Sequence, residues 1–135
     1  MNLIELTNNT TQTISANQPI VLGSISRRVG VFTDYSAPAT VLTIRECGYY
    51  EITLKVNAEA TAATQAMEIT MFIDGTEAPE TLATHVGTAI GDIETLNTHK
   101  KIRVFACSDL SISFVNTGAA DTTYTGLILD IKKVC

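Results

Sequence analysis

The feature that most constrains the fold is a strict alternation of apolar and polar residues that follows Cys47. Tyr50, Ile52, Leu54 and Val56 alternate with polar side chains. Successive side chains of a β-strand point to opposite faces, so this run predicts a long central strand with one face in a hydrophobic core. The opposite face is not wholly polar, because Cys47 and Tyr49 lie at its start.

Strand signals recur along the whole chain, and no longer stretch has helical periodicity with caps. A second alternating run, Met67–Ile73, ends at the turn signal Asp74-Gly75. Two further runs, 102–107 and 110–114, predict a hairpin. Other expected strands are Pro19–Ile25, Arg28–Phe32, Val41–Ile44, Thr84–Ile90 and Tyr124–Val134. The chain is therefore predicted to be all-β, a two-sheet antiparallel sandwich of Greek-key or jelly-roll type.

The length of 135 residues predicts a single domain, 1–135. Residues 7–13 are rich in Asn, Thr and Gln and cannot build a core. We therefore expect residues 1–18 to form an N-terminal arm that is loosely ordered or docked on a partner. The opening residues lack a secretory signal pattern, which predicts folding in the cytoplasm where the chain is made.

Composition argues against several functional classes. The net charge of -5 provides no basic field for a phosphate backbone, so no nucleic-acid partner is expected. No apolar run approaches the roughly 20 residues that span a bilayer, so no membrane partner is expected either. Three cysteines without C-x-x-C spacing indicate neither a zinc site nor a disulfide framework.

No residue pattern indicates catalysis. His85 and His99 have no second metal ligand nearby in sequence, so no metal site is predicted. Ser108 follows Cys107 without the context of a nucleophile elbow. Single aspartates at turns, Asp74, Asp92 and Asp109, are explained by hydrogen bonds to local backbone. A pair of carboxylates could hydrolyse a glycoside, but the sequence arranges none of the available ones into a groove. These carboxylates are Glu51, Glu68, Asp74, Glu77, Glu80, Asp92 and Glu94. We expect no enzyme and no cofactor.

Four segments follow one another in a recognisable order between residues 41 and 134, and residues before 41 fit that order only loosely. The first opens the long strand, the second ends a strand at a turn, the third joins a strand to a turn, and the fourth is a terminal strand. They are Gly48-x-Tyr50-x-Ile52, Met71–Gly75, Ile102–Asp109 and Leu127-x-Leu129-x-Ile131.

This order resembles the trimeric jelly roll of the tumour necrosis factor family, of complement and collagen-like heads, and of bacterial spore-surface filament heads. Ser108 stands where that pattern has glycine. In addition, the opening Asn2–Asn8 and the pair Arg27-Arg28 resemble phage and prophage structural proteins of gut bacteria.

The resemblance implies a homotrimer in which the sheet containing Gly48-x-Tyr50 packs around the threefold axis. It also implies that the strand from Cys47 lies antiparallel beside the strand that ends at Cys107. Both cysteines would then share one face with Tyr49 and Phe105, opposite the core, as free thiols covered by the assembly. An apolar patch on a sheet is rarely left exposed. The predicted trimer interface is Tyr49, Phe105, Ile128, Cys47 and Cys107.

Two functions follow from the resemblance. The first is a non-enzymatic structural protein of a bacteriophage virion, either a capsid decoration or a head or tail fibre component, in contact with other virion proteins. The alternative is a receptor-binding or adhesive trimeric head of a phage fibre or bacterial surface filament, whose loops contact host-surface glycan or protein. A fibre head usually follows a repetitive stalk, and none precedes Met1, so we expect decoration.

Overall fold

The long alternating strand lies inside one of two six-stranded sheets. The computed structural model describes residues 2–37, 39–106 and 108–135. We call the sheet that contains β6 (Gly48–Ala60) sheet A. Its strand order is β10 (Ile93–Val104), β6, β12 (Thr122–Lys133), β1 (Leu3–Asn8) and β3 (Ser24–Val29), and β2 (Gln12–Ile14) pairs with β12.

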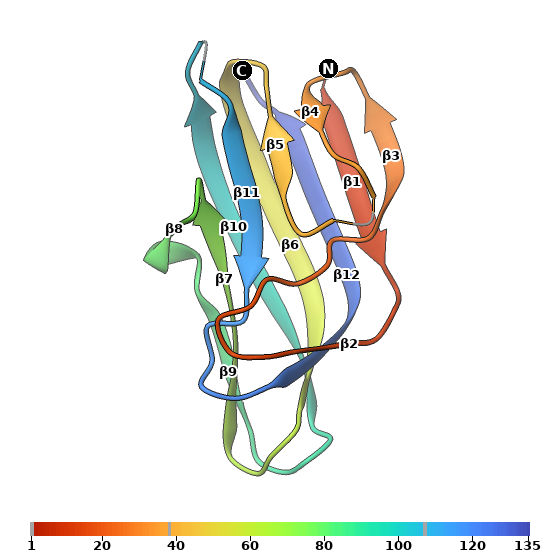
Figure 1. The fold of residues 1–135 in the computed structure, drawn as a ribbon, viewed down its shortest axis with the longest axis vertical. Helices are drawn as coiled ribbons and strands as arrows, with labels where there is room; N and C mark the ends of the chain where they lie inside the picture. The colour runs from red at the N-terminus through yellow and green to blue at the C-terminus, as the bar shows by residue number, and fades with distance from the viewer. Residues whose placement is uncertain (1, 38, 107) are drawn as a thin grey trace.

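Sheet B faces sheet A across the core (Figure 1). Its order is β4 (Thr33–Asp34), β5 (Leu42–Ile44), β11 (Leu110–Val115), β7 (Gln65–Ile73) and β8 (Thr76–Glu77), and β9 (Ala83–Gly87) also pairs with β7. All pairings within the two sheets are antiparallel. The predicted all-β, two-sheet jelly roll is confirmed.

The core lies between the two sheets and is built from the alternation visible in sequence. Tyr50, Ile52 and Leu54 of β6 are fully buried. Met67 and Met71 of β7 face them from sheet B and are equally buried. Both termini lie at one end of the sandwich, and the β6–β7 turn and the β9–β10 loop lie at the other (Figure 1). We call the end opposite the termini the loop end, and define it as residues 61–64, 88–92 and 117–121.

The expectation of a loosely ordered arm over residues 1–18 is wrong for its first part. β1 is paired on both sides, with β12 and with β3. Ile4 and Leu6 have no exposed surface. The sequence signal was weak because only two apolar residues of this short strand face the core. Residues 3–8 are therefore part of the sheet and not an appendage.

The predicted hairpin of residues 102–107 and 110–114 is also wrong. β10 pairs with β6 in sheet A, whereas β11 pairs with β5 and β7 in sheet B. The intervening residues carry the chain from one sheet to the other. Alternation alone cannot distinguish a hairpin from such a crossover, because both place every second residue in the core.

Pro19–Ile25 does not form the predicted strand. Ile20 and Leu22 are buried, and their amides donate to the Phe114 and Ala39 carbonyls, but residues 19–23 form an isolated bridge and not a strand before β3 begins at Ser24. Gly23 has φ +87°, and a Cβ there would lie 2.2 Å from the carbonyl oxygen of Thr7. A positive φ and this close approach require glycine and interrupt the extended chain. The expected strand Arg28–Phe32 likewise corresponds only to the end of β3.

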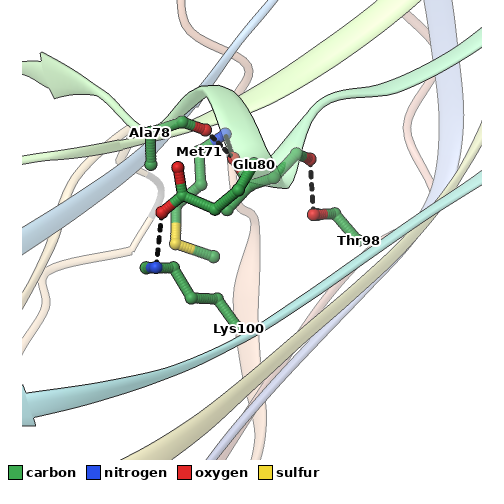
Figure 2. A network of polar contacts seen from close by, with 6 residues as sticks. Met71, Ala78, Glu80, Thr98 and Lys100 are labelled. Carbon is green, nitrogen blue, oxygen red and sulfur yellow. Dashed lines mark hydrogen bonds and ion pairs between the residues drawn. The ribbon is translucent and has the colours of Figure 1, made fainter.

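A short 3-10 helix, η1 (Pro79–Thr81), connects the two sheets at one side (Figure 2). The buried hydroxyl of Thr81 accepts a hydrogen bond from the Met71 amide of β7 at 2.9 Å. The Thr98 hydroxyl of β10 donates to the Thr81 carbonyl at 2.6 Å. Lys100, further along the same strand, forms an ion pair with Glu80.

Among the described residues, no helix is long and apolar enough to cross a membrane.

Candidate functional site

The outer face of sheet A, the face turned away from the core, carries an exposed cluster of two aromatic rings around an arginine. Tyr49 of β6 is 46% exposed and Phe105, which follows β10, is 59% exposed. Arg103 lies opposite Tyr49 in the register of β10 and β6. Its guanidinium carbon lies 4.5 Å from the centroid of the Phe105 ring and 5.5 Å from that of Tyr49. We call Tyr49, Arg103 and Phe105 the aromatic–arginine cluster.

The last residues of the chain hold the backbone of this cluster in place. The Val134 amide donates to the Tyr49 carbonyl at 2.8 Å, and the Tyr49 amide donates to the Cys135 carbonyl at 3.1 Å. Lys133 forms an ion pair with Glu46 at 2.8 Å. That contact, with a hydrogen bond from Asn2, holds the pKa of the Glu46 carboxyl below its usual range. The start of β6 is therefore fixed from the C-terminal side.

Ile128 lies on the same outer face but away from the cluster. It is 39% exposed and sits opposite Lys55 of β6. Lys55 is six residues along β6 from Tyr49, which corresponds to roughly 20 Å. Ile128 and the aromatic–arginine cluster are therefore separate apolar points on one polar face.

Cys47 and Cys135 are free and exposed in the single chain. The predicted place of Cys107 on this face, and its closeness to Cys47, lie outside the described residues. The expected antiparallel arrangement of their strands is present, because Val104 at the end of β10 lies opposite Gly48 at the start of β6.

Near the middle of the outer face two carboxyl groups lie side by side. Glu5 of β1 and Asp130 of β12 are direct cross-strand partners. They line a hollow of about 310 Å³ together with Arg27, Lys132 and residues of β6. Sequence reasoning missed this pair, since it depends on knowing that β1 and β12 are neighbours.

The two carboxyl groups have opposite pKa shifts. The pKa of Glu5 is lowered, first by a hydrogen bond from the Ser26 hydroxyl at 2.8 Å and then by its contact with Asp130. The pKa of Asp130 is raised, first by burial and then by Glu5. Two carboxylates in contact cannot both ionise without cost, so Asp130 is the member that retains its proton to higher pH.

The edge of the outer face at β10 is basic. His99, Lys101 and Arg103 alternate with core-facing residues along this strand. His99 contacts Glu51 of β6 at 2.9 Å, and this hydrogen bond is the main reason why the pKa of Glu51 is lowered. The outer face thus has basic residues along one edge and, near its middle, a carboxyl pair with Arg27 and Lys132 beside it.

Among the residues considered for catalysis or metal binding, each histidine contacts one carboxylate, and Asp74 and Asp92 bond to backbone amides. Asp92 accepts bonds from the Thr88 and Ala89 amides, as expected of a turn aspartate. Asp74 instead accepts a hydrogen bond from the Ser111 amide of β11, which is not local backbone. His85 contacts Glu94 at 3.2 Å. In residues 2–37, 39–106 and 108–135, no three His, Cys, Asp or Glu side chains could together hold a metal ion.

Strand order and layer arrangement define the class: the protein has a TNF-like jelly roll. No protein-family profile and no curated protein sequence matches the chain. Among solved structures it is similar to the globular domain of zebrafish complement 1qA protein, at 7% identity and a TM-score of 0.69, covering 100% of this chain and 98% of that one.

Two further structures are similar over nearly their whole length. Murine APRIL at pH 5.0 is 12% identical with a TM-score of 0.71, and 98% of each chain is covered. PRD1 vertex protein P5 is 14% identical with a TM-score of 0.61, covering 99% of this chain and 97% of that one. At these identities the likeness shows the fold.

Proposed function

We propose that the protein is a non-enzymatic structural protein of a bacteriophage virion, a capsid decoration or head or tail fibre component that forms a homotrimer. It is made in the host cytoplasm and resides in the particle, in contact with other virion proteins. The fold supports this proposal, because one of the similar structures is a vertex protein. The opening residues support it as well, since they resemble phage structural proteins.

The observation that carries the proposal is the aromatic–arginine cluster on the outer face of sheet A. Tyr, Phe and Arg are enriched in protein interfaces, and Tyr and Arg are frequent among the residues that contribute most of the binding energy. Both rings are about half exposed in the single chain. A closed cyclic assembly buries such a patch on every subunit and leaves no open end. The likeness to TNF-like folds also supports a trimer.

Two measurements test the proposal. Light scattering of the purified chain at micromolar concentration is expected to give three times the chain mass of 14.5 kDa. Mass spectrometry of purified virions from a host that carries the gene is expected to detect the chain in amounts comparable to other particle proteins. A monomer in solution contradicts the assembly, and absence from virions contradicts the location.

A receptor-binding or adhesive head is the second candidate, and the loop end favours it. Ile90 of the loop end is 73% exposed, and Val86 and Ile93 on the adjoining strands β9 and β10 are 55% and 60% exposed. The surrounding ranges 59–68, 84–95 and 116–125 contain no Lys or Arg. An exposed apolar surface at the tip suits contact with a host-surface protein or glycan. Ile90→Asp is then expected to reduce binding to host cells while the trimer and its incorporation into particles are retained.

A further inference from the structure

The loop end carries an apolar hollow of about 270 Å³. Residues 62–66 and 119–120 line it, and five of these seven residues are alanine. Ala66 alternates with the core-facing Met67, so the hollow opens on the outer face of sheet B. Val86 of β9 is the direct cross-strand partner of Ala66 and is exposed, so it extends the apolar surface. We call this site the alanine hollow.

Hydrogen bonds within the chain fix the shape of the alanine hollow. The side chain of Gln65 is bonded on its oxygen to the β6–β7 turn and on its nitrogen to the segment before and at the start of β12. The Thr64 hydroxyl donates to the Ala63 carbonyl at 2.7 Å. The loop 88–92 is bonded to Ala60, beside the same turn, at 2.9 Å. The hollow is therefore preformed, and the groups that it presents to a partner are mainly methyl groups.

The same end of the molecule holds the whole net charge of the chain. The ranges 59–68, 84–95 and 116–125 contain five acidic residues and no Lys or Arg. The other ranges contain nine acidic and nine basic residues, so their charges cancel. Two of the five carboxylates flank the hollow, because Asp121 directly follows Ala120 and Glu68 lies two positions from Ala66 on the same face of β7. A surface of this charge favours a basic partner.

The alanine hollow remains accessible in the proposed trimer. That trimer buries the outer face of sheet A, whereas the hollow opens on the outer face of sheet B. Pockets that enclose a drug-sized ligand have volumes of roughly 300–1,000 Å³. The smaller alanine hollow therefore suits a single aliphatic or aromatic side chain.

We propose that the alanine hollow binds one aliphatic or aromatic side chain of a partner protein whose surrounding surface is rich in Lys and Arg. This inference rests on the second candidate function, the adhesive head, and names its partner as a protein and not a glycan. Sugar hydroxyls need polar groups that fix their orientation, whereas the hollow presents methyl groups. The single aromatic residue of the three acidic ranges, Tyr124, is fully buried and cannot stack on a sugar ring.

Nuclear magnetic resonance of the trimer with labelled alanine methyl groups tests the hollow directly. The probe is a short synthetic peptide with a central leucine flanked by lysines. Its titration into the millimolar range is expected to shift the methyl signals of Ala63, Ala66 and Ala120 and to leave that of Ala37, outside the loop end, unchanged. Glycine in place of the leucine is expected to weaken binding at least about tenfold, because the buried side chain is lost. Glutamates in place of the lysines are expected to abolish it.

Two variants with matched controls separate the apolar contact from the charge. Ala119→Leu fills the hollow and is expected to weaken peptide binding at least about tenfold, whereas Ala89→Leu adds the same side chain at an exposed position outside it. Asp121→Lys reverses a charge beside the hollow and is expected to weaken binding as well. Its control, Glu77→Lys, reverses an exposed charge on β8 and is expected to have little effect. Circular dichroism with a thermal melt verifies that each variant is folded.

The peptide titrations decide whether the hollow is a binding site. Hollow signals that stay fixed with the leucine peptide, or equal affinity for the leucine and glycine peptides, refute the inference. Signals that move on dilution of the protein alone show that a second copy occupies the hollow, which also overturns it.

Binding to host cells separates failure of this inference from failure of the adhesive head. If Ile90→Asp reduces cell binding and folded Ala119→Leu does not, the head function stands and the hollow is not its contact. If neither variant reduces cell binding, the head function itself is overturned. Protease treatment of the cells is expected to abolish binding. Binding that survives protease and is lost on periodate oxidation of the glycans identifies a glycan partner and refutes the inference.

Discussion

Gln65, at the start of β7, shows how one buried polar residue can order the loop end. Its side-chain oxygen accepts bonds from the amides of Thr61 and Ala62 at 2.7 and 3.1 Å. Its side-chain nitrogen donates to the Asp121 carbonyl at 2.7 Å and the Thr122 hydroxyl at 2.9 Å. One amide group therefore connects the β6–β7 turn to the loop before β12.

Gln65→Ala is expected to destabilise the protein by about 2–3 kcal/mol, because it removes these four hydrogen bonds, the one to the buried Thr122 hydroxyl among them. Urea unfolding measures this loss. Gln65→Glu retains the acceptor toward Thr61 and Ala62 but removes both donors, so an intermediate or larger loss is expected from it. Thr64→Ala, at an exposed position of the same turn, is the control. A Gln65→Ala protein of wild-type stability would contradict this role.

The contribution of Asp92 in the loop end to the stability of the fold is expected to depend on pH. Bonds from the Ala89 amide and then from Thr88 hold the pKa of the Asp92 carboxyl below its usual range. A carboxyl whose pKa is lower in the folded state stabilises it above the unfolded pKa of about 3.9, and this stabilisation is lost as the pH falls through the folded pKa. Asp92→Ala is therefore expected to melt below the wild type at pH 7. The two melting curves are expected to converge in the acidic range below about pH 3.9.

At the scale of single residues, the side chains that could be assigned to the core or to the outer face were those of one strand with regular alternation. The alternation after Cys47 correctly placed Tyr50 in the core and Tyr49 on the outer face. Glu5 and Asp130 were missed because their contact joins strands from opposite ends of the chain. No local pattern reports such a pairing.

At the scale of elements, η1 is the feature that the sequence did not reveal. It follows Ala78 in a polar stretch without periodicity, yet it supplies hydrogen bonds to β7 of sheet B and β10 of sheet A. The strands with clean alternation, β6, β7 and β12, were recovered near their observed bounds. The short strands β5 and β11 were also predicted near their observed bounds, but β2, β4, β8 and the crossover after β10 were not, since tertiary pairing and not local propensity defines them.

Thr81→Val is expected to destabilise the sandwich by about 1–3 kcal/mol, because it removes the partner of the buried Met71 amide while keeping the side-chain shape. Amide hydrogen exchange at Met71 is expected to accelerate more than exchange at the middle of β6. Thr81→Ser retains the hydroxyl and is expected to preserve protection of Met71. Equal protection of Met71 in the Val and Ser variants would show that the η1 contact is dispensable.

At the scale of the whole molecule, the outer face of sheet A determines assembly in the proposed trimer. Phe105→Glu is expected to dissociate that trimer, because it would bury a charge without a partner at the aromatic–arginine cluster. Tyr49→Glu is expected to act in the same way, whereas Glu51→Gln should change little. Light scattering across a dilution series measures the effect. A trimeric Phe105→Glu protein would show that the cluster lies outside the interface.

Cysteine labelling gives an independent view of the same surface. Cys47 and Cys135 are both exposed in the single chain. In a trimer built around the outer face, Cys47 is expected to be protected from a thiol reagent while Cys135 reacts. In Phe105→Glu both are expected to react. Peptide mapping by mass spectrometry identifies the labelled cysteine, and rapid labelling of Cys47 in the wild type would argue against its place in the interface.

The position of β1 has a consequence for how the protein is made. β1 lies between β3 and β12, so its second neighbour is the strand of sheet A that is synthesised last. β6 likewise waits for β10 and β12, both synthesised after it. Pairings between distant segments form slowly, and unpaired strands are prone to aggregation in the meantime. We therefore expect sheet A to close only after β12 has left the ribosome, and a nascent chain arrested before residue 122 to remain sensitive to protease along β1.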